Sequence, residues 1–426
     1  MSTLNLPDES EPLQLPPELV TIVLEHLDGE NLKQDLFSCS LVSKDWYYAT
    51  RPMLFPELTF AVRARSELHS ELAQRNGHGP LDDLLQFFEQ SPHISRYVEK
   101  LRIDAPVDDL SPPDITTYPD VHPTTLGRIL RLLPRLTVLE FHDVVFHPEF
   151  YEAWKQDERT FDGDLSRVTV SFGTRAADID SLDEALHLLE LFAGNIQELC
   201  LSTIYAVQTR KPTVLQLQRL RVAALIIDEV TDIGPIVRAV QLSPSVWSKT
   251  LQSIYLSWIN MKDLFGAEGL LEDVKPYLKH FGCNLFPLLD SKPADQALFR
   301  ILDFSDYDSL ETLTLGLVLM QNASWNENIW RDVCRLLRSL PASRAAVLDV
   351  TFELCTDRLD YGKHIALDSS WSALDATLAG RCRSVRLFPS RKSYYTPATH
   401  PFNANMRKYI AEALPGLATA KVLRFE

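Results

Sequence analysis

From residue 98 to the C-terminus, the chain repeats a short pattern of apolar positions. Apolar side chains stand at positions i, i+3 and i+5, and polar residues alternate with the last two of them, as in a β-strand that is buried on one face. So many copies favour a repeated structural unit over chance. The first positions of the ten copies are Val98, Leu136, Leu165, Ile196, Leu217, Leu251, Leu310, Ala345, Cys382 and Ala420.

Stretches with helical periodicity lie between these copies. Examples are residues 126–133, 182–192 and 329–340. The longest gap, between Leu251 and Leu310, hides a further unit or holds an insertion. A strand followed by an amphipathic helix buries its apolar edge against the next such unit. We therefore predict an α/β fold in which strand-plus-helix coils stack into a solenoid, with an unrelated α/β domain of several parallel strands as the alternative.

A different pattern fills residues 15–55, where apolar residues recur at helical spacing in three short stretches. The first stretch begins at Pro16–Pro17, because proline suits the first turn of a helix, and ends near Gly29. The second surrounds Leu36, and the third ends at about Pro52. Three helices of this length bury little apolar surface, so we expect the unit to dock on a partner.

The order of residues in this stretch carries a resemblance. The stretch begins with Leu15–Pro16, and apolar residues follow at helical spacing. Near its end, residues 42–46 have the sequence Val-Ser-Lys-x-Trp. These features resemble the F-box. The resemblance implies docking to the Skp-type adaptor of a cullin-RING ubiquitin ligase, with the rest of the chain presenting a substrate.

The resemblance also implies which residues contact the adaptor. We expect Leu19 and Trp46 mainly to pack the helices together, and Leu15, Pro16 and Ile22 mainly to contact the adaptor. The full set of adaptor-binding candidates is Leu15, Pro16, Leu19, Ile22, Leu27, Leu32, Val42 and Trp46.

The downstream pattern L-x-x-L-x-L, followed by a turn and a helix, resembles an irregular leucine-rich repeat, which often accompanies an F-box. Most copies lack the asparagine that follows the strand in the regular repeat. Proline-rich stretches between copies are expected to loop outward. We predict a disordered lead-in at 1–13, an F-box-like helical unit at 14–60 and a repeat domain at 61–426, with loop insertions near 105–125, 262–308 and 389–405.

Strand alternation predicts which side chains line the inner face of the curved sheet. If i+3 and i+5 face the core, position i+4 faces the opposite side. This row is mixed in charge and holds an aromatic residue, which suits recognition of a protein or peptide, where Arg and Tyr often anchor binding. The candidate target-binding residues are Arg102, Arg221, Tyr255, Asp349, Arg386 and Arg424.

Composition argues against several other function classes. The chain of 426 residues holds 42 Lys and Arg against 58 Asp and Glu, a net charge of −16, which disfavours nucleic acid and anionic membranes as partners. Its six cysteines include no C-x-x-C pair, and no glycine-rich phosphate loop occurs, so we expect no metal and no cofactor. No secretory signal is evident and no apolar run is long enough to span a membrane, which favours the cytosol or nucleus.

Two hypotheses follow. In the first, the chain is a non-catalytic substrate-recognition subunit of the ligase, not an enzyme. In the second, it is a free-standing interaction scaffold whose N-terminal helices only cap the array, as the ends of repeat arrays require. Removal of the N-terminal helices separates the two hypotheses, because a cap is needed for solubility and a docking unit is not.

Overall fold

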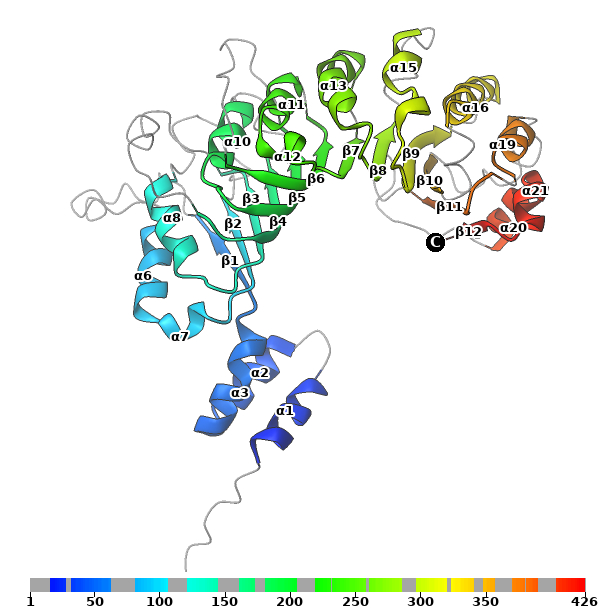
Figure 1. The fold of residues 1–426 in the computed structure, drawn as a ribbon. Coiled ribbons are helices and arrows are strands. Elements are labelled where there is room, and N and C mark those ends of the chain that lie inside the picture. The colour runs from blue at the N-terminus through cyan, green and yellow to red at the C-terminus, as the bar shows by residue number, and fades with distance from the viewer. Residues whose placement is uncertain are drawn as a thin grey trace, which may run out of the picture.

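A strand-helix array forms most of the molecule in the computed structural model, and three helices precede it (Figure 1). The structure describes residues 16–27, 32–62, 81–105, 121–144, 161–172, 181–204, 219–230, 232–257, 260–285, 296–319, 323–340, 348–356, 370–379, 381–389 and 404–425. The predicted lead-in at 1–13 and most of the predicted insertions at 105–125 and 389–405 lie outside these residues.

All strands in the described part of the chain belong to one parallel sheet. They lie side by side in the order of the sequence, and each pairs in parallel with the next. This order is that of a repeat array, in which each unit contacts only its neighbours. The strands are β1 (Glu57–Ala61), β2 (Lys100–Asp104), β3 (Val138–His142), β4 (Leu165–Ser171), β5 (Asn195–Ser202), β6 (Arg221–Asp228), β7 (Ser253–Ser257), β8 (His280–Asn284), β9 (Thr312–Leu319), β10 (Asp349–Thr356), β11 (Ser384–Pro389) and β12 (Leu423–Phe425).

Helices connect the strands and form the outer layer of an arch, while the other face of the sheet lines its inside (Figure 1). The helices of the array are α6 (Asp82–Gln90), α7 (Pro92–Ser95), α8 (Pro123–Arg131), α10 (Ser181–Leu189), α11 (Gly234–Gln241), α12 (Pro244–Trp247), α13 (Met261–Val274), α15 (Gln296–Ile301), α16 (Ala323–Arg338), α19 (Ser370–Leu378), α20 (Ala404–Ala413) and α21 (Pro415–Thr419). A 3₁₀ turn, η4 (Phe304–Asp306), follows α15.

One continuous apolar core lies between the sheet and these helices, from Val62 to Leu417. The strand positions i+3 and i+5 supply much of it, and Leu101 and Ile103 on β2, for example, have no exposed surface. Burial of these alternating side chains is what fixes the register of each strand. The apolar pattern therefore sets the inner and outer faces of the arch.

The pattern misses two strands, β1 and β8. Strand β8 carries Phe281 and Cys283 at the core positions, both buried, and Leu278 at the first position. The long gap after Leu251 thus holds a complete coil. The predicted loop insertion at 262–308 is wrong for the described residues of that segment, because their helices and strand bury apolar side chains in the common core.

Strand β1 moves the boundary of the N-terminal unit. It pairs with β2 along its whole length, and the Pro56 carbonyl accepts hydrogen bonds from the amides of Glu99 and Lys100 at 2.9 and 2.8 Å. Residues 57–60 therefore belong to the sheet. The helical unit ends at Pro56 and not at residue 60 as predicted.

Two strands differ in register from the prediction. Leu225 on β6 and Val350 on β10 occupy the core position that the pattern gives to Leu220 and Leu348. In the i+4 row, Ile226 and Thr351 therefore replace the predicted Arg221 and Asp349, whereas Arg102, Tyr255, Arg386 and Arg424 keep their places.

Candidate functional site

The N-terminal unit consists of α1 (Pro17–Glu25), α2 (Leu32–Ser40) and α3 (Lys44–Leu54). Pro17 opens α1, where its missing N–H costs nothing. Ser43 caps α3, and its hydroxyl accepts a hydrogen bond from the Trp46 amide at 3.4 Å. The three helices form in the stretches that the sequence pattern predicts, except that α3 continues through Pro52 to Leu54 and does not end at about Pro52.

The unit has a small core of its own. Its fully buried apolar side chains are Val20, Leu24 and Leu36, and this cluster is separate from the core of the array. Leu27, Leu32 and Trp46 pack against it and are half-buried, as are Met53 and Leu54. Of the adaptor-binding candidates, Leu27, Leu32 and Trp46 thus hold the helices together.

A second group of apolar side chains on the same unit faces solvent. Leu19, Ile22 and Val23 are 46%, 49% and 44% exposed, and their spacing places them on one stripe of α1. The expectation that Leu19 mainly packs within the unit is therefore wrong. Pro16 is also exposed, and Leu15 lies outside the described residues.

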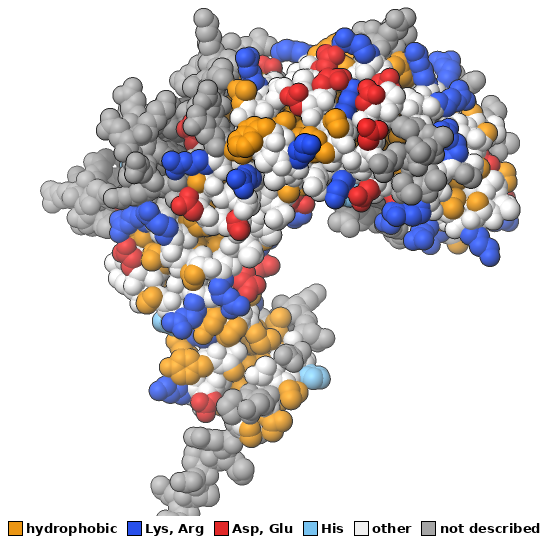
Figure 2. All heavy atoms as spheres, in the orientation of Figure 1, with side chains coloured by type: hydrophobic (Ala, Val, Ile, Leu, Met, Phe, Trp, Pro, Cys, Tyr) orange, Lys and Arg blue, Asp and Glu red, His pale blue; other side chains and the backbone are white. Residues whose placement is uncertain are grey.

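The end of α2 and the turn that follows it are equally apolar. Phe37, Leu41 and Val42 are 58%, 72% and 67% exposed. We call the six side chains Leu19, Ile22, Val23, Phe37, Leu41 and Val42 the exposed apolar set. Figure 2 shows hydrophobic side chains gathered on this unit at the N-terminal end of the arch. Such a concentration on so small a unit is typical of an interaction site.

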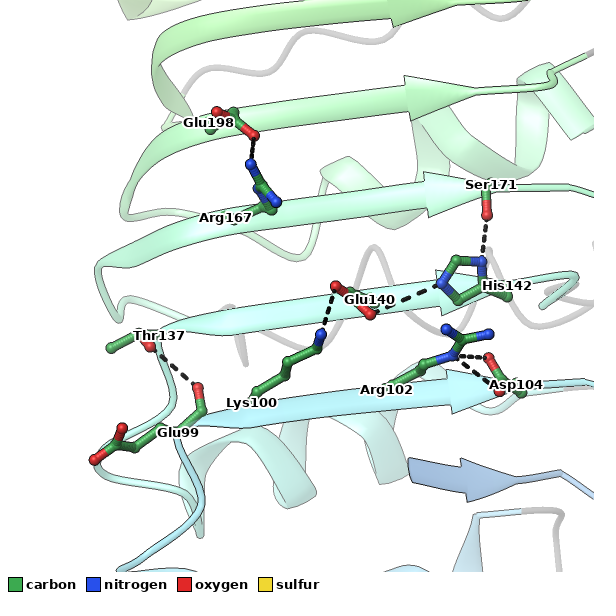
Figure 3. A network of polar contacts seen from close by, with 10 residues as sticks. All are labelled: Glu99, Lys100, Arg102, Asp104, Thr137, Glu140, His142, Arg167, Ser171 and Glu198. Carbon is green, nitrogen blue, oxygen red and sulfur yellow. Dashed lines mark hydrogen bonds and ion pairs between the residues drawn. The ribbon is translucent and has the colours of Figure 1, made fainter. Parts of the chain in front are cut away.

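The N-terminal part of the inner face of the arch carries a network of polar contacts (Figure 3). Basic side chains on β2–β4 each lie beside an acid, so this region is nearly neutral. Lys100 Nζ lies 3.1 Å from Glu140, Arg102 Nε lies 2.7 Å from Asp104, and Arg167 Nη2 lies 2.5 Å from Glu198. The candidate Arg102 is therefore already engaged by an acid of its own strand.

His142 ends this network on β3. Its Nδ1 lies 2.5 Å from the Ser171 hydroxyl, and its Nε2 lies 3.9 Å from Glu140. Burial, and secondly the charge of Arg102, lower the pKa of His142. A lowered pKa means that the folded protein binds this proton less tightly than the unfolded chain does, so the associated stability is present above about pH 6.5 and is lost as the pH falls.

We expect His142→Gln to flatten the dependence of the melting temperature on pH between about pH 7.5 and pH 5.5, because the residue that titrates has been removed. The measurement is a series of thermal melts across this range. His93→Gln, at an exposed position on α7, is the matched substitution for comparison. Equal slopes for the wild type and the His142 variant would contradict the assignment.

The centre of the inner face is held together by a tyrosine. The Tyr255 hydroxyl on β7 donates to Glu353 Oε2 on β10 at 2.7 Å. The ring lies across Gly282 of β8, where an added Cβ would come within 2.1 Å of Tyr255 Cδ2. Burial, and secondly the charge of Glu353, raise the pKa of Tyr255, which keeps the hydroxyl protonated as a donor. Tyr255 thus ties strands together and is not an open anchor for a target.

Gly282→Ala should lower the free energy of unfolding by about 1–3 kcal/mol, because the new methyl group displaces the Tyr255 ring and breaks its hydrogen bond. Chemical denaturation measures the loss. Tyr255→Phe removes the hydrogen bond alone and should cost less than Gly282→Ala. If Gly282→Ala costs nothing, the ring does not rest on this glycine.

The remaining candidates lie on β6 and on the last strands of the array. Asp349 accepts hydrogen bonds from Arg383 Nε at 2.9 Å and from the Ser384 hydroxyl at 2.7 Å. Arg383, first, and Ser384 lower the pKa of Asp349 to about 2 against the opposing effect of its burial. Arg221 is exposed at the start of β6, opposite Asn195.

Arg386 and Arg424 lie directly opposite each other on β11 and β12. Arg386 is half-buried, and Arg424 is exposed. The structure thus brings two of the six predicted target-binding residues together.

No group of three His, Cys, Asp or Glu side chains in the described ranges could hold a metal ion. Within the same ranges, no helix combines the length and the apolar character needed to cross a membrane.

A comparison with protein families identifies the N-terminal unit. Residues 12–56 match the F-box domain, and these residues contain α1, α2 and α3. The chain therefore carries an F-box domain, followed by an α/β array of parallel strands and helices. No curated protein matches the chain in sequence.

Proposed function

We propose that this chain is a non-catalytic substrate-recognition subunit of a cullin-RING ubiquitin ligase. Its F-box docks the Skp-type adaptor, and its array, an irregular leucine-rich repeat, binds a protein target. The observation that carries this proposal is the F-box match at residues 12–56 together with the exposed apolar set on the same helices.

Adaptor docking would remove the exposed apolar set from water. A stable interface of this kind buries roughly 1,200–2,000 Å² and depends on a few buried anchors. We assign the anchoring role to Ile22 and Val42, with Leu19 and Pro16 beside them and Leu15 at the entry. The half-buried Leu27, Leu32 and Trp46 act on the interface by holding the helices in place.

The alternative of a simple cap receives less support. A cap would bury its apolar side chains against the first coil, whereas the core of the unit and the core of the array are separate clusters. The exposed apolar set would also be unexplained. The array supplies its own first strand, β1, which pairs with β2.

The decisive experiment compares the full chain with a chain that lacks residues 1–55, which keeps Pro56 and β1. Each is mixed with purified Skp-type adaptor and analysed by size-exclusion chromatography. The full chain should elute with the adaptor, and the truncated chain should stay folded and elute alone. Aggregation of the truncated chain, or no complex with the full chain, would support the cap and overturn the proposal.

Target binding by the array is proposed on different grounds. The inner face of the arch is a continuous parallel sheet with polar and charged side chains, and such curved faces suit recognition of extended partners. A location in the cytosol or nucleus, where cullin-RING ligases work, is part of the same proposal. Neither nucleic acid nor a membrane is proposed as a partner, because the chain has a net charge of −16.

A further inference from the structure

We propose that the edge of the array beside α12 binds a peptide segment of a partner protein in which an apolar anchor lies between acidic residues. This edge is where α11 ends and where β6 and β7 begin. The inference goes beyond the proposed function, because it assigns a surface outside the inner face of the arch and a chemical class of ligand for it. We call the following six exposed residues the α12 surface: Arg219, Arg221, Arg238, Leu242, Trp247 and Lys249.

Hydrogen bonds on two sides hold α12 in place at this edge. The hydroxyl of Ser245, which is fully buried, donates to the Leu220 carbonyl at 3.3 Å and accepts the Val222 amide at 2.9 Å. The Tyr277 hydroxyl, from the coil that follows, donates to the Val246 carbonyl at 2.8 Å. The backbone that carries the exposed side chains of α12 is therefore fixed, and a ligand that binds a preformed surface loses less of its binding free energy to ordering.

The apolar part of the α12 surface consists of Trp247 and Leu242, which are 70% and 49% exposed. The Leu242 amide donates to the Arg238 carbonyl at 3.0 Å, so Leu242 continues α11 and lies on the same side of it as Arg238. Figure 2 shows hydrophobic side chains gathered over α12, with Lys and Arg side chains beside them. Trp, Tyr and Arg are enriched among the residues that anchor protein interfaces. An exposed Trp on a fixed backbone beside an Arg is thus suited to anchor a partner.

Four cations complete the α12 surface. Arg219 and Arg221 are chain neighbours of the two β6 residues that Ser245 binds, and Lys249 lies two residues after Trp247. Arg238 lies one helical turn before Leu242. A ligand that covers Trp247 and Leu242 would therefore come within reach of several positive charges.

These four cations differ from other cations of the array in having no acidic partner among the described residues. Elsewhere in the array, Lys100 lies 3.1 Å from Glu140, and Arg300 lies 2.8 Å from Glu268. The cations of the α12 surface, by contrast, form no ion pair with another described residue. Their charge is thus available to a ligand.

The sequence around α12 is positive, although the chain as a whole is acidic. Residues 199–262 hold 7 Lys and Arg against 3 Asp and Glu, a net charge of +4, whereas the rest of the chain holds 35 against 55, a net charge of −20. Two of the three acids lie from Asp228 onward, about 23 Å from Arg221 at the other end of β6. The third, Asp232, lies 3.6 Å from Lys262. Since 23 Å exceeds a Debye length of about 8 Å, acids at the far end of β6 do not offset the positive charge at its start.

Acids of the neighbouring coils border the α12 surface and limit its size. Asp164 accepts the backbone amide and the side-chain amide of Asn195, at 3.2 and 2.7 Å, and Asn195 is the register partner of Arg221. On the other side, Asp273 accepts Gln241 Nε2 at 2.6 Å. The positive area is thus a few residues wide, which suits a short peptide better than a membrane.

A short peptide with an apolar anchor between acidic residues fits these features. Its anchor would cover Trp247 and Leu242, and its carboxylates would pair with the arginine forks through parallel hydrogen bonds. A nucleic acid also has bases that stack on tryptophan. Its phosphates, however, would extend beyond the α12 surface and be repelled by the charge of −20 on the rest of the chain.

The test uses the full chain and a fluorescein-labelled peptide of about ten residues, with a Leu-Phe pair between two runs of Glu, followed by fluorescence anisotropy at about 50 mM salt. One comparison peptide has Gln in place of Glu, and another has Ala in place of the Leu-Phe pair. We expect the first peptide to bind at least about tenfold more tightly than either comparison peptide. Equal binding of all three peptides, or binding of none, would overturn the proposal.

An apolar pair of variants locates the anchor. Trp247→Ala should weaken binding of the Glu peptide about 10- to 100-fold, because it removes the aromatic surface that the anchor covers. Phe87→Ala, at a 38% exposed position on α6, is the matched substitution and should change binding less than about twofold. Far-ultraviolet circular dichroism verifies that each variant is folded. Equal losses from the two substitutions would overturn the proposal.

A second pair of variants tests the charge. Arg219→Gln with Arg221→Gln should weaken binding about tenfold at about 50 mM salt, and less at about 500 mM, where ionic contacts are screened. Arg96→Gln with Arg131→Gln removes the same charge from exposed positions before β2 and β3 and should change binding less than about twofold. A loss that does not depend on which arginine pair is replaced would contradict the proposal.

Further measurements identify occupants of other kinds. A single-stranded oligonucleotide that binds more tightly than the Glu peptide, and loses binding in Trp247→Ala, would replace the peptide by nucleic acid. A dimer of the full chain that Trp247→Ala converts to a monomer in light scattering would replace it by a second copy. Each variant is also mixed with the adaptor. Failure of adaptor binding with peptide binding intact would contradict the proposed function alone, and the reverse result would contradict the α12 surface alone.

Discussion

Replacement of both Ile22 and Val42 by aspartate should abolish binding of the Skp-type adaptor and leave the array folded. These side chains are 49% and 67% exposed, so their substitution disturbs the core of the unit little. In a docked complex, each new carboxylate would be buried in an apolar interface without a partner, which is strongly unfavourable. We expect affinity to fall at least about 100-fold, measured by isothermal titration calorimetry.

A matched control is available on the array. Trp247 on α12 is 70% exposed, and Trp247→Asp also replaces an exposed apolar side chain by a carboxylate. It should leave adaptor affinity within about twofold, which shows that position and not surface charge matters. Unchanged affinity in the Ile22 and Val42 double variant, with the helices intact by circular dichroism, would place the adaptor on another surface.

Trp330→Ala should cause the largest loss of stability of any single substitution that we consider. Trp330 on α16 has no exposed surface, and its ring centroid lies 4.5 Å from that of Trp371 on α19 and 5.8 Å from that of Phe352 on β10. Truncation leaves a cavity between two helices and the sheet. The expected decrease in the free energy of unfolding is about 3–5 kcal/mol.

Urea denaturation followed by far-ultraviolet circular dichroism measures this loss, because it does not depend on tryptophan fluorescence. Trp247→Ala is the same substitution at an exposed position and should change the free energy of unfolding by less than about 0.5 kcal/mol. Comparable effects of the two substitutions would mean that Trp330 does not hold α16 to its neighbours.

The apolar pattern predicts the positions of most strands because burial on one face of a parallel sheet demands it. The prediction fails on β6, where two copies of the pattern overlap. Val222, Leu225 and Ile227 repeat on β6 the spacing of Leu217, Leu220 and Val222, so the sequence fits two registers equally well. Only pairing with β5 and β7 distinguishes them. The first of these registers puts Arg221 on the inner face, whereas in the structure Arg221 lies at the exposed start of the strand.

The shift on β10 has a milder consequence. Val347, Val350 and Phe352 repeat the predicted spacing two residues later, and a shift of two residues keeps each side chain on the same face. Asp349 therefore stays toward the inner face but occupies the neighbouring row. The pattern did not predict strand β8, because Gly282 and Cys283 weaken its apolar signal.

The docking surface is harder to predict than the helices that carry it. Helix α1 is apolar on nearly every side, with Val20 and Leu24 buried and Leu19 and Ile22 exposed. Helical periodicity cannot sort the two groups, since the packing of α2 and α3 decides which side is covered. Contacts across the sheet are equally hard to predict from the sequence, because Tyr255 and Glu353, for example, are 98 residues apart.

The close junction between the F-box and the array would affect the geometry of ubiquitin transfer in the proposed ligase complex. Only Phe55 and Pro56 separate α3 from β1, and two residues span at most about 7 Å. In that complex, the distance from the F-box along the sheet increases by about 4.8 Å with each strand. A target held at β12 would lie eleven strand spacings from β1, roughly 50 Å along the arc, and one held at β2 would lie one strand spacing from β1. The strand at which a target binds would thus determine which of its lysines come within reach of the ubiquitin-charged enzyme.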